Sequence, residues 1–283
     1  MRHIAPARGE MMARSLYISN TDTFDLWSAA RRQRRVLHAL MLRNIRTKFF
    51  GNGLGMLVGI AWPLSHILIL VTLYTLAGRA PPYGDSIALF VATGVVPFQV
   101  FNYFARFMMI AVIRSRPLLA FPEVKVLDIL FASATLEFLS TCCVVLAFLV
   151  LAWLAGIDAI PINIVQASYA LGASVLLGLG FGVLNGVIAL AMPTWVTGYV
   201  LTTIVLWFTA GIFFVPDALP ATIREYLAYH PVLQVIEWMR SAYYEGYGDL
   251  MLDRTYAVCF SLGSLFLGLL LERALRGHVL SLR

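Results

Sequence analysis

Charged residues and cysteines are scarce in this 283-residue chain. Only 13% of its residues are charged, whereas ordinary soluble domains carry about 25%. The three cysteines, Cys142, Cys143 and Cys259, all lie in apolar segments, and no Cys-x-x-Cys pair occurs. A metal or redox centre therefore has no support in the sequence, and a soluble enzyme is excluded.

Nucleotide-binding and catalytic motifs are also absent from the sequence. There is no G-x-x-x-x-G-K-[ST] phosphate loop, no H-E-x-x-H and no G-x-S-x-G elbow. The apolar segments lack the Asp, Glu and His relays expected of a proton-driven transporter. We expect no cofactor in this chain, so the energy for any transport would come from another chain.

Six long apolar segments dominate the sequence instead. A helix of roughly 20 apolar residues crosses the ~30 Å hydrocarbon core of a bilayer. We therefore expect an all-α polytopic membrane protein with six transmembrane helices, forming one domain over residues 55–283. The segments lie at about 55–77, 87–113, 129–155, 168–192, 196–214 and 256–271.

The positive charges are sorted between alternate connections. Lys and Arg accumulate on the cytoplasmic side of membrane proteins. They crowd the segment before the first span, the loop between spans two and three, and the C-terminal tail, and they are sparse in the other connections. This sorting predicts that both termini are cytoplasmic. The residues are Arg31, Arg32, Arg34, Arg35, Arg43, Arg46, Lys48, Arg114, Arg116, Lys125, Arg273, Arg276 and Arg283.

The region before the first span is expected to form an amphipathic interface helix at 24–54, preceded by a disordered cytoplasmic tail at 1–23. Leu37, Met41, Ile45 and Phe49 recur every four residues, with basic residues around them. Such a helix lies in the plane of the membrane interface. It is either a topogenic anchor or a gate and docking surface, and the sequence leaves both open.

Two connections have unusual composition. The loop at 114–128 carries the apolar run Leu118-Leu119-Ala120-Phe121 between prolines 117 and 122, which indicates either embedding in the membrane surface or a socket in a partner protein. The connection at 216–255 is too polar to span yet rich in aromatic residues. We expect two short helices there, re-entering the outer leaflet as periplasmic re-entrant helices.

Two charged residues lie inside spans. Arg106 and Glu137 are each about two turns from the cytoplasmic end of their segments, in spans two and three. Because isolated charge in lipid is costly, we predict an intramembrane ion pair between them.

Four stretches together resemble one family. They read LRNIRTKFFGNGLGMLVGIAWPL, LFVATGVVPFQVF, RPLLAFPEVKVLDIL and YHPVLQVIEWMRSAYYEGY, where His230 replaces the usual Asn. In this order they resemble the membrane permease subunit of type-2 ABC exporters, in the branch that exports capsular polysaccharide. O-antigen and teichoic-acid permeases are near relatives. The resemblance covers roughly residues 30–283.

The resemblance implies a homodimer in the bacterial inner membrane, bound to two copies of a cytoplasmic ATPase that carries ATP and Mg²⁺. A lipid-linked polysaccharide would pass between the two protomers to periplasmic and outer-membrane partners. The helix at 24–54 would be the gate helix, and no nucleic acid is involved. The loop would be the coupling helix, formed by Pro117, Leu118, Leu119, Phe121, Pro122, Glu123 and Lys125.

Aromatic side chains suit a sliding sugar polymer, although helix packing and an interfacial belt are equally simple readings of them. The candidate conduit residues are Phe98, Phe101, Tyr103, Phe104, Trp207, Tyr243, Tyr244 and Tyr247.

Other functions stay open at this point. The substrate of a type-2 ABC permease could instead be O-antigen, teichoic acid or a small hydrophobic molecule. A membrane-embedded glycosyl- or acyltransferase would need a deep acid or histidine, for which Glu137 and His66 are the available candidates. A purely structural scaffold is the remaining possibility.

Overall fold

The computed structural model describes residues 26–48, 53–247 and 250–281, and this part of the chain contains helices and no strand. The tail predicted at 1–23 lies outside the described residues. The α-helices are α2 (Leu26–Lys48), α3 (Gly53–Leu76), α4 (Ile87–Arg114), α5 (Val126–Leu154), α6 (Ile164–Ala191), α7 (Trp195–Thr209), α8 (Ala221–Leu227), α9 (Pro231–Tyr243) and α10 (Arg254–Ser281), with 3₁₀ turns η1 (Arg116–Ala120) and η2 (Pro216–Ala218).

Five of the described helices are long and apolar enough to cross a bilayer, namely α3, α4, α5, α6 and α10. The all-helical membrane architecture is therefore confirmed. The fifth predicted span, at 196–214, instead forms α7, which has 15 residues and ends at Thr209. At a rise of 1.5 Å per residue α7 is about 22 Å long, short of a ~30 Å core.

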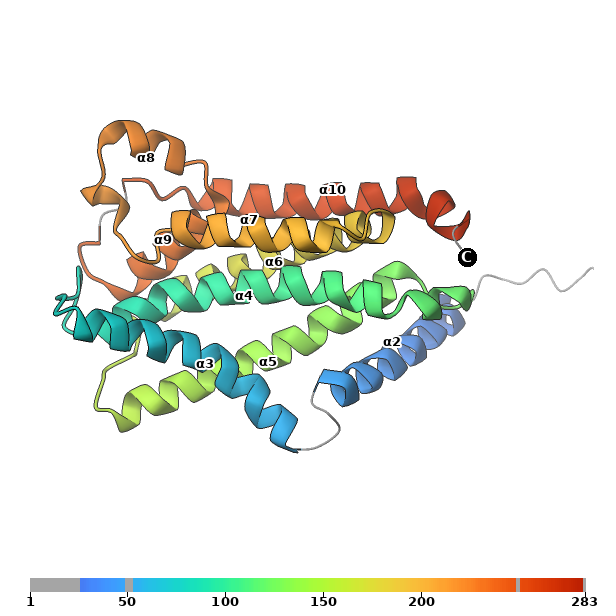
Figure 1. Cartoon of the computed structure of the whole chain (residues 1–283), viewed down its shortest axis with the longest axis horizontal. Coiled ribbons are helices and arrows are strands. Elements are labelled where there is room, and N and C mark those ends of the chain that lie inside the picture. The colour runs from blue at the N-terminus through green and yellow to red at the C-terminus, as the bar shows by residue number, and fades with distance from the viewer. Residues whose placement is uncertain (1–25, 49–52, 248–249, 282–283) are drawn as a thin grey trace, which may run out of the picture.

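The centre of the bundle is the pair α4 and α6 (Figure 1). Two thirds of the apolar window of each is buried, against 17% to 22% for α3, α5 and α10. Glycines allow this close approach, because a Cβ on Gly178 would lie 2.6 Å from the Cβ of Phe104 and 2.9 Å from the carbonyl of Phe101. Gly180 meets α10 in the same way, 2.9 Å from the amide nitrogen of Leu265. These two glycines of α6 therefore pack within the chain, against α4 and α10.

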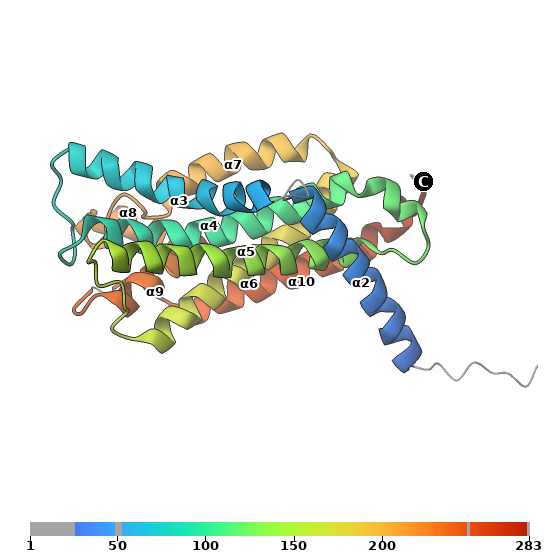
Figure 2. The ribbon, with the colours of Figure 1, turned by 90° about the horizontal axis from the view of Figure 1, so that it is seen from below.

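The two ends of the bundle carry different elements. In Figure 1, α2 and the end of α10 lie at the right, while α8 and α9 lie at the left. In Figure 2, α2 leaves the bundle at an angle to α4 and α5, near the end of α10. The basic residues of α2 thus lie at the same end of the bundle as the last part of α10, and the cytoplasmic location of that end stays a prediction.

Where helix α7 ends, one buried arginine donates hydrogen bonds to the backbone carbonyl groups of the segment that follows. Arg240 of α9 is fully buried and donates to the carbonyl oxygens of Gly211 (2.8 Å), Ile212 (3.1 Å) and Phe214 (3.1 Å). Its guanidinium lies 4.3 Å from the centre of the Phe90 ring. Gly211 has φ +80°, a conformation that favours glycine. These contacts satisfy backbone that would otherwise be left unpaired at this depth.

The predicted pair of short helices in the connection exists as α8 and α9. α8 has no buried residue, whereas nearly every residue of α9 is buried inside the protein. His230 caps α9, with Nδ1 accepting from the amide of Leu233 at 3.0 Å and Nε2 lying 3.1 Å from the Thr209 hydroxyl. Whether the two helices re-enter a leaflet stays a prediction.

Candidate functional site

The loop between α4 and α5 divides into a buried and an exposed side. Leu119 of η1 is only 5% exposed and belongs to the same core cluster as Leu40 of α2 and Val112 of α4. Phe121, two residues later, is 60% exposed. Leu119 is therefore part of the chain's own core, which corrects its place in the predicted docking surface, and Leu118 is half-buried. The exposed members of the predicted set are Pro117, Phe121, Pro122, Glu123 and Lys125.

The helix α2 is bonded to both ends of this loop. Gln33 donates to the Oδ1 of Asp128 in the first turn of α5, and Arg43 donates to the hydroxyl of Ser115 at the end of α4. The other oxygen of Asp128 accepts from the amide of Lys125 at 3.0 Å and closes the start of α5. The predicted interface helix is thus hydrogen-bonded to the residues at both ends of the loop.

Glu137 has a partner other than the predicted one. Its Oε1 lies 2.7 Å from the Nζ of Lys48, which also donates to the Ser140 hydroxyl at 3.1 Å. The Glu137 side chain is 4% exposed, and the Arg106 side chain is exposed. The Arg106–Glu137 pair is therefore wrong: the end of α2 brings Lys48 to the depth of Glu137 and neutralises it there.

Three candidate conduit residues of α4 are packed inside the chain. Phe98, Phe101 and Phe104 are each 1% exposed. The Phe98 ring makes a T-shaped contact with Trp207 of α7, centroids 4.6 Å apart, and Phe101 does the same with Phe181 of α6 at 5.3 Å. No face of these three rings is left for a polymer in this conformation, which corrects their assignment to the conduit and favours helix packing.

The tyrosines near the end of α9 are also largely enclosed. Tyr244 and Tyr247 form a cluster with Phe90, and Tyr243 packs against it partly buried. Burial raises the pKa of Tyr244 to about 12, and that of Tyr247 well above its usual range, so both phenols stay protonated. The Tyr247 hydroxyl donates to Glu237 at 2.8 Å. All three tyrosines pack within the chain, and their assignment to the conduit stays a prediction.

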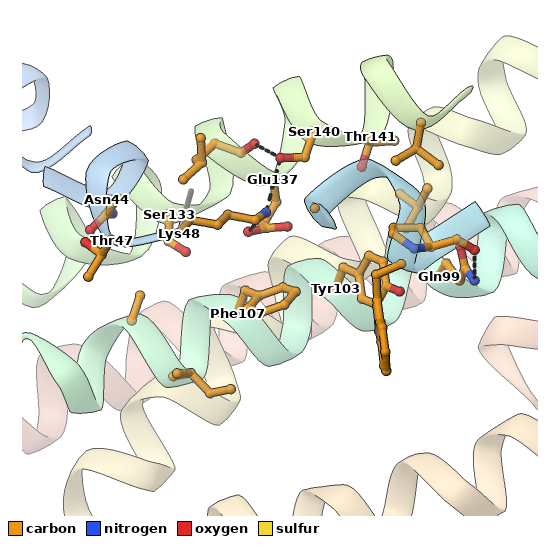
Figure 3. Close-up of a pocket in the computed structure, with 18 of the residues that line it drawn as sticks. Asn44, Thr47, Lys48, Gln99, Tyr103, Phe107, Ser133, Glu137, Ser140 and Thr141 are labelled. Carbon is orange, nitrogen blue, oxygen red and sulfur yellow. Dashed lines mark hydrogen bonds and ion pairs between the residues drawn. The ribbon is translucent and has the colours of Figure 1, made fainter. Parts of the chain in front are cut away.

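Tyr103 is the candidate conduit residue that reaches a cavity. The cavity has a volume of about 520 Å³ and lies between α2, α3, α4 and α5 (Figure 3). That size is within the range of ligand sites. The Tyr103 hydroxyl is buried and has no hydrogen-bond partner among the described residues.

The cavity is basic at one end and apolar at the other. Arg43 and Arg114 belong to the end near η1, and the Lys48–Glu137 pair forms the middle. Trp62 of α3, whose side chain is 63% exposed, lines the cavity at the end away from η1. There Gln99, Val96, Val100, Pro63, Thr141, Val144 and Val145 complete the wall.

In the sequence, Lys48 was counted only among the basic residues that indicate topology, and its pairing with Glu137 was not predicted. Its place directly before the first apolar span was the available signal, because a carboxylate inside a span needs a cation at its own depth. Gln33 and Ser115 carried no signal, since ordinary polar residues reveal no distant partner. Among the described residues, no group of three or more His, Cys, Asp and Glu side chains is placed to hold a metal ion.

Comparison with known proteins assigns relatives to the chain. No family model matches it. It is 28% identical over 241 residues to the polysialic acid transport protein KpsM of Escherichia coli. These residues make up 85% of this chain and 93% of the relative. The chain is a homologue of polysaccharide transport proteins. It is also 23% identical over 241 residues to the capsule polysaccharide export inner-membrane protein CtrC of Neisseria meningitidis, 84% of this chain and 89% of the relative. The resemblance to the capsule-export branch is thereby confirmed.

Proposed function

We propose that this chain is the membrane-spanning permease subunit of an ATP-driven exporter. It moves a lipid-linked polysaccharide, of the capsular class, from the cytoplasm to the periplasm. Two copies form the channel in the bacterial inner membrane, with both termini cytoplasmic. The observation that carries the proposal is the similarity to KpsM and CtrC along most of the length of all three proteins.

The energy source in this proposal is a separate ATPase, which binds ATP and Mg²⁺. The sequence has no phosphate loop of its own. In this proposal the ATPase covers Phe121, whose side chain is 60% exposed in the loop between α4 and α5. Neighbouring Glu123 and Lys125 would form the polar rim of that contact.

The homodimer rests on the resemblance and on the exposed apolar faces of α3 and α7. Leu57, Leu68 and Leu73 of α3 are each more than half exposed, as are Leu201 and Val205 of α7. Such faces could be covered by lipid or by a second copy of the chain. The second copy is therefore part of the proposal. Periplasmic and outer-membrane partners would receive the polymer.

Deletion of the gene tests the proposed function. We expect polysaccharide to disappear from the cell surface and to accumulate inside the cell, measured by carbohydrate analysis of fractionated cells, and plasmid-borne wild-type protein should restore export. Loss of O-antigen or teichoic acid instead of capsule would favour the alternative substrates. An unchanged distribution of all three polymers would refute the proposal.

Phe121→Asp tests the ATPase contact. A charge at an apolar contact costs several kcal/mol, so the variant should lose co-purification with the phosphate-loop ATPase and lose export. Because Phe121 is exposed, its thermal stability should match the wild type. Phe121→Leu is the matched control and should retain both activities. Normal export by Phe121→Asp would contradict this assignment.

A further inference from the structure

The cavity between α2, α3, α4 and α5 combines a cationic mouth with an apolar interior. On α4 the lining runs along one face from Val96 to Arg114, at spacings of three and four residues. At 1.5 Å per residue this face is about 27 Å long. One leaflet of a ~30 Å core is about 15 Å deep, so the cavity is long enough for an acyl chain together with its headgroup.

The mouth is built to hold an anion. Arg43 and Arg114 both line it, and the Arg43 guanidinium is held in place by its bond to the Ser115 hydroxyl. Asn44 and Thr47 of α2 add polar groups beside them. Arginine forks match phosphate oxygens in bidentate geometry. Among the described residues that line the cavity, the one carboxylate is Glu137, which is already paired with Lys48.

The interior suits a hydrocarbon chain with a few polar groups along its path. Val58, Trp62 and Ile110 line it together with Phe107, and Lys48 lies 4.9 Å from the centre of the Phe107 ring. The unpartnered Tyr103 hydroxyl offers a hydrogen bond to an ester or glycerol oxygen below the phosphate. Figure 3 shows the side chains of Lys48, Tyr103 and Glu137 around the same space.

We propose that this cavity binds an acyl lipid whose phosphate headgroup has a net negative charge, with the phosphate on Arg43 and Arg114 and one acyl chain along α4 toward Trp62. The lipid has two possible sources, the anionic phospholipid of the cytoplasmic leaflet and the lipid end of the polymer cargo. The second source rests on the proposed export function, whereas lipid binding itself does not.

Native mass spectrometry of the purified, full-length protein tests the binding. After delipidation and titration with phosphatidylglycerol or phosphatidylcholine of equal chain length, we expect preferential retention of phosphatidylglycerol. Arg114→Gln should weaken that binding about tenfold, the effect of losing one charge-assisted contact. Arg116→Gln removes an exposed charge that does not line the cavity and is the matched control.

A steric pair separates the cavity from the general lipid surface. Val145 lines the cavity, whereas its neighbour Leu146 is 64% exposed on the outside of α5. Val145→Trp should abolish specific retention by filling the space, and Leu146→Trp should leave it unchanged. Equal retention in the two variants, or equal binding of both lipids by the wild type, would overturn the proposal. Dissociation of a dimer by Val145→Trp alone would give the cavity to a second copy and also overturn it.

The source is distinguished by the host. Protein purified from cells that make no polymer should carry phosphatidylglycerol. If protein from polymer-producing cells carries phosphatidylglycerol as well, the site belongs to the leaflet lipid. If protein from polymer-producing cells carries the polymer's lipid in its place, and Val145→Trp removes it, the site holds cargo. Failure of lipid binding in both hosts would refute the cavity proposal and leave the export assay, which uses whole cells, untouched.

Discussion

Replacement of Arg240 by methionine should loosen the break after α7. Methionine keeps much of the length of the arginine stem but removes every donor. Three carbonyl oxygens, of Gly211, Ile212 and Phe214, then lose the guanidinium that satisfies them. Glu237, whose Oε1 lies 3.8 Å from the guanidinium, would keep its burial and lose this cation.

The free energy of unfolding of Arg240→Met should be about 4 kcal/mol lower than that of the wild type. Hydrogen bonds from a charged donor contribute about 1.5–3 kcal/mol each, and removing one partner of a buried pair costs about 3–5 kcal/mol. These figures overlap, because the same guanidinium makes all the contacts. For a chain of this size 1 kcal/mol shifts the melting temperature by about 2–4 °C, so Arg240→Met should melt about 10 °C lower.

Thermal melts of purified protein in detergent provide the measurement. Arg254→Met, at an exposed arginine at the start of α10, is the control and should melt with the wild type. Adding Glu237→Gln to Arg240→Met should recover part of the loss, because the buried negative charge disappears while Tyr247 keeps an acceptor. A melting temperature of Arg240→Met within about 2 °C of the wild type would refute the reasoning.

Three further perturbations follow from described contacts. Burial lowers the pKa of His230, so below about pH 6.5 the unfolded chain binds more protons than the folded chain, and the free energy of unfolding should fall as the pH drops. Thermal melts between about pH 8 and pH 5 should show this fall, and His230→Asn, which can still cap α9, should make the melting temperature less dependent on pH. Gly178→Ala should destabilise the α4–α6 contact by about 1–3 kcal/mol, whereas Gly172→Ala, with open space at its Cβ, should stabilise the protein by up to about 1 kcal/mol; equal melting temperatures would contradict the close packing at Gly178. Glu137→Gln should lower the melting temperature by leaving Lys48 without its carboxylate, and restoration by adding Lys48→Met is the check.

The sequence predicted what depends on local composition. The length of the apolar runs predicted the five long helices. It could not show that the fifth span stops at Thr209, because the stop depends on Arg240, which is far along the chain.

The errors at the candidate site have the same physical origin. Leu119 and Phe121 are neighbouring apolar residues in one loop, and only the fold turns one inward and the other outward. Glu137 required a cation at its depth, but Arg106 and Lys48 were both available from the sequence. Choosing between them required the path of α2, which no local pattern encodes.

The two bonds from α2 to Ser115 and Asp128 have a mechanical consequence. Ser115 caps the end of α4 and Asp128 lies in the first turn of α5, so α2 links the two helix ends across the loop that joins them. The attachment points on α2, Gln33 and Arg43, are about 15 Å apart along its axis. Spreading the two helix ends apart would break one of these bonds, so α2 opposes the separation of α4 and α5 at the loop.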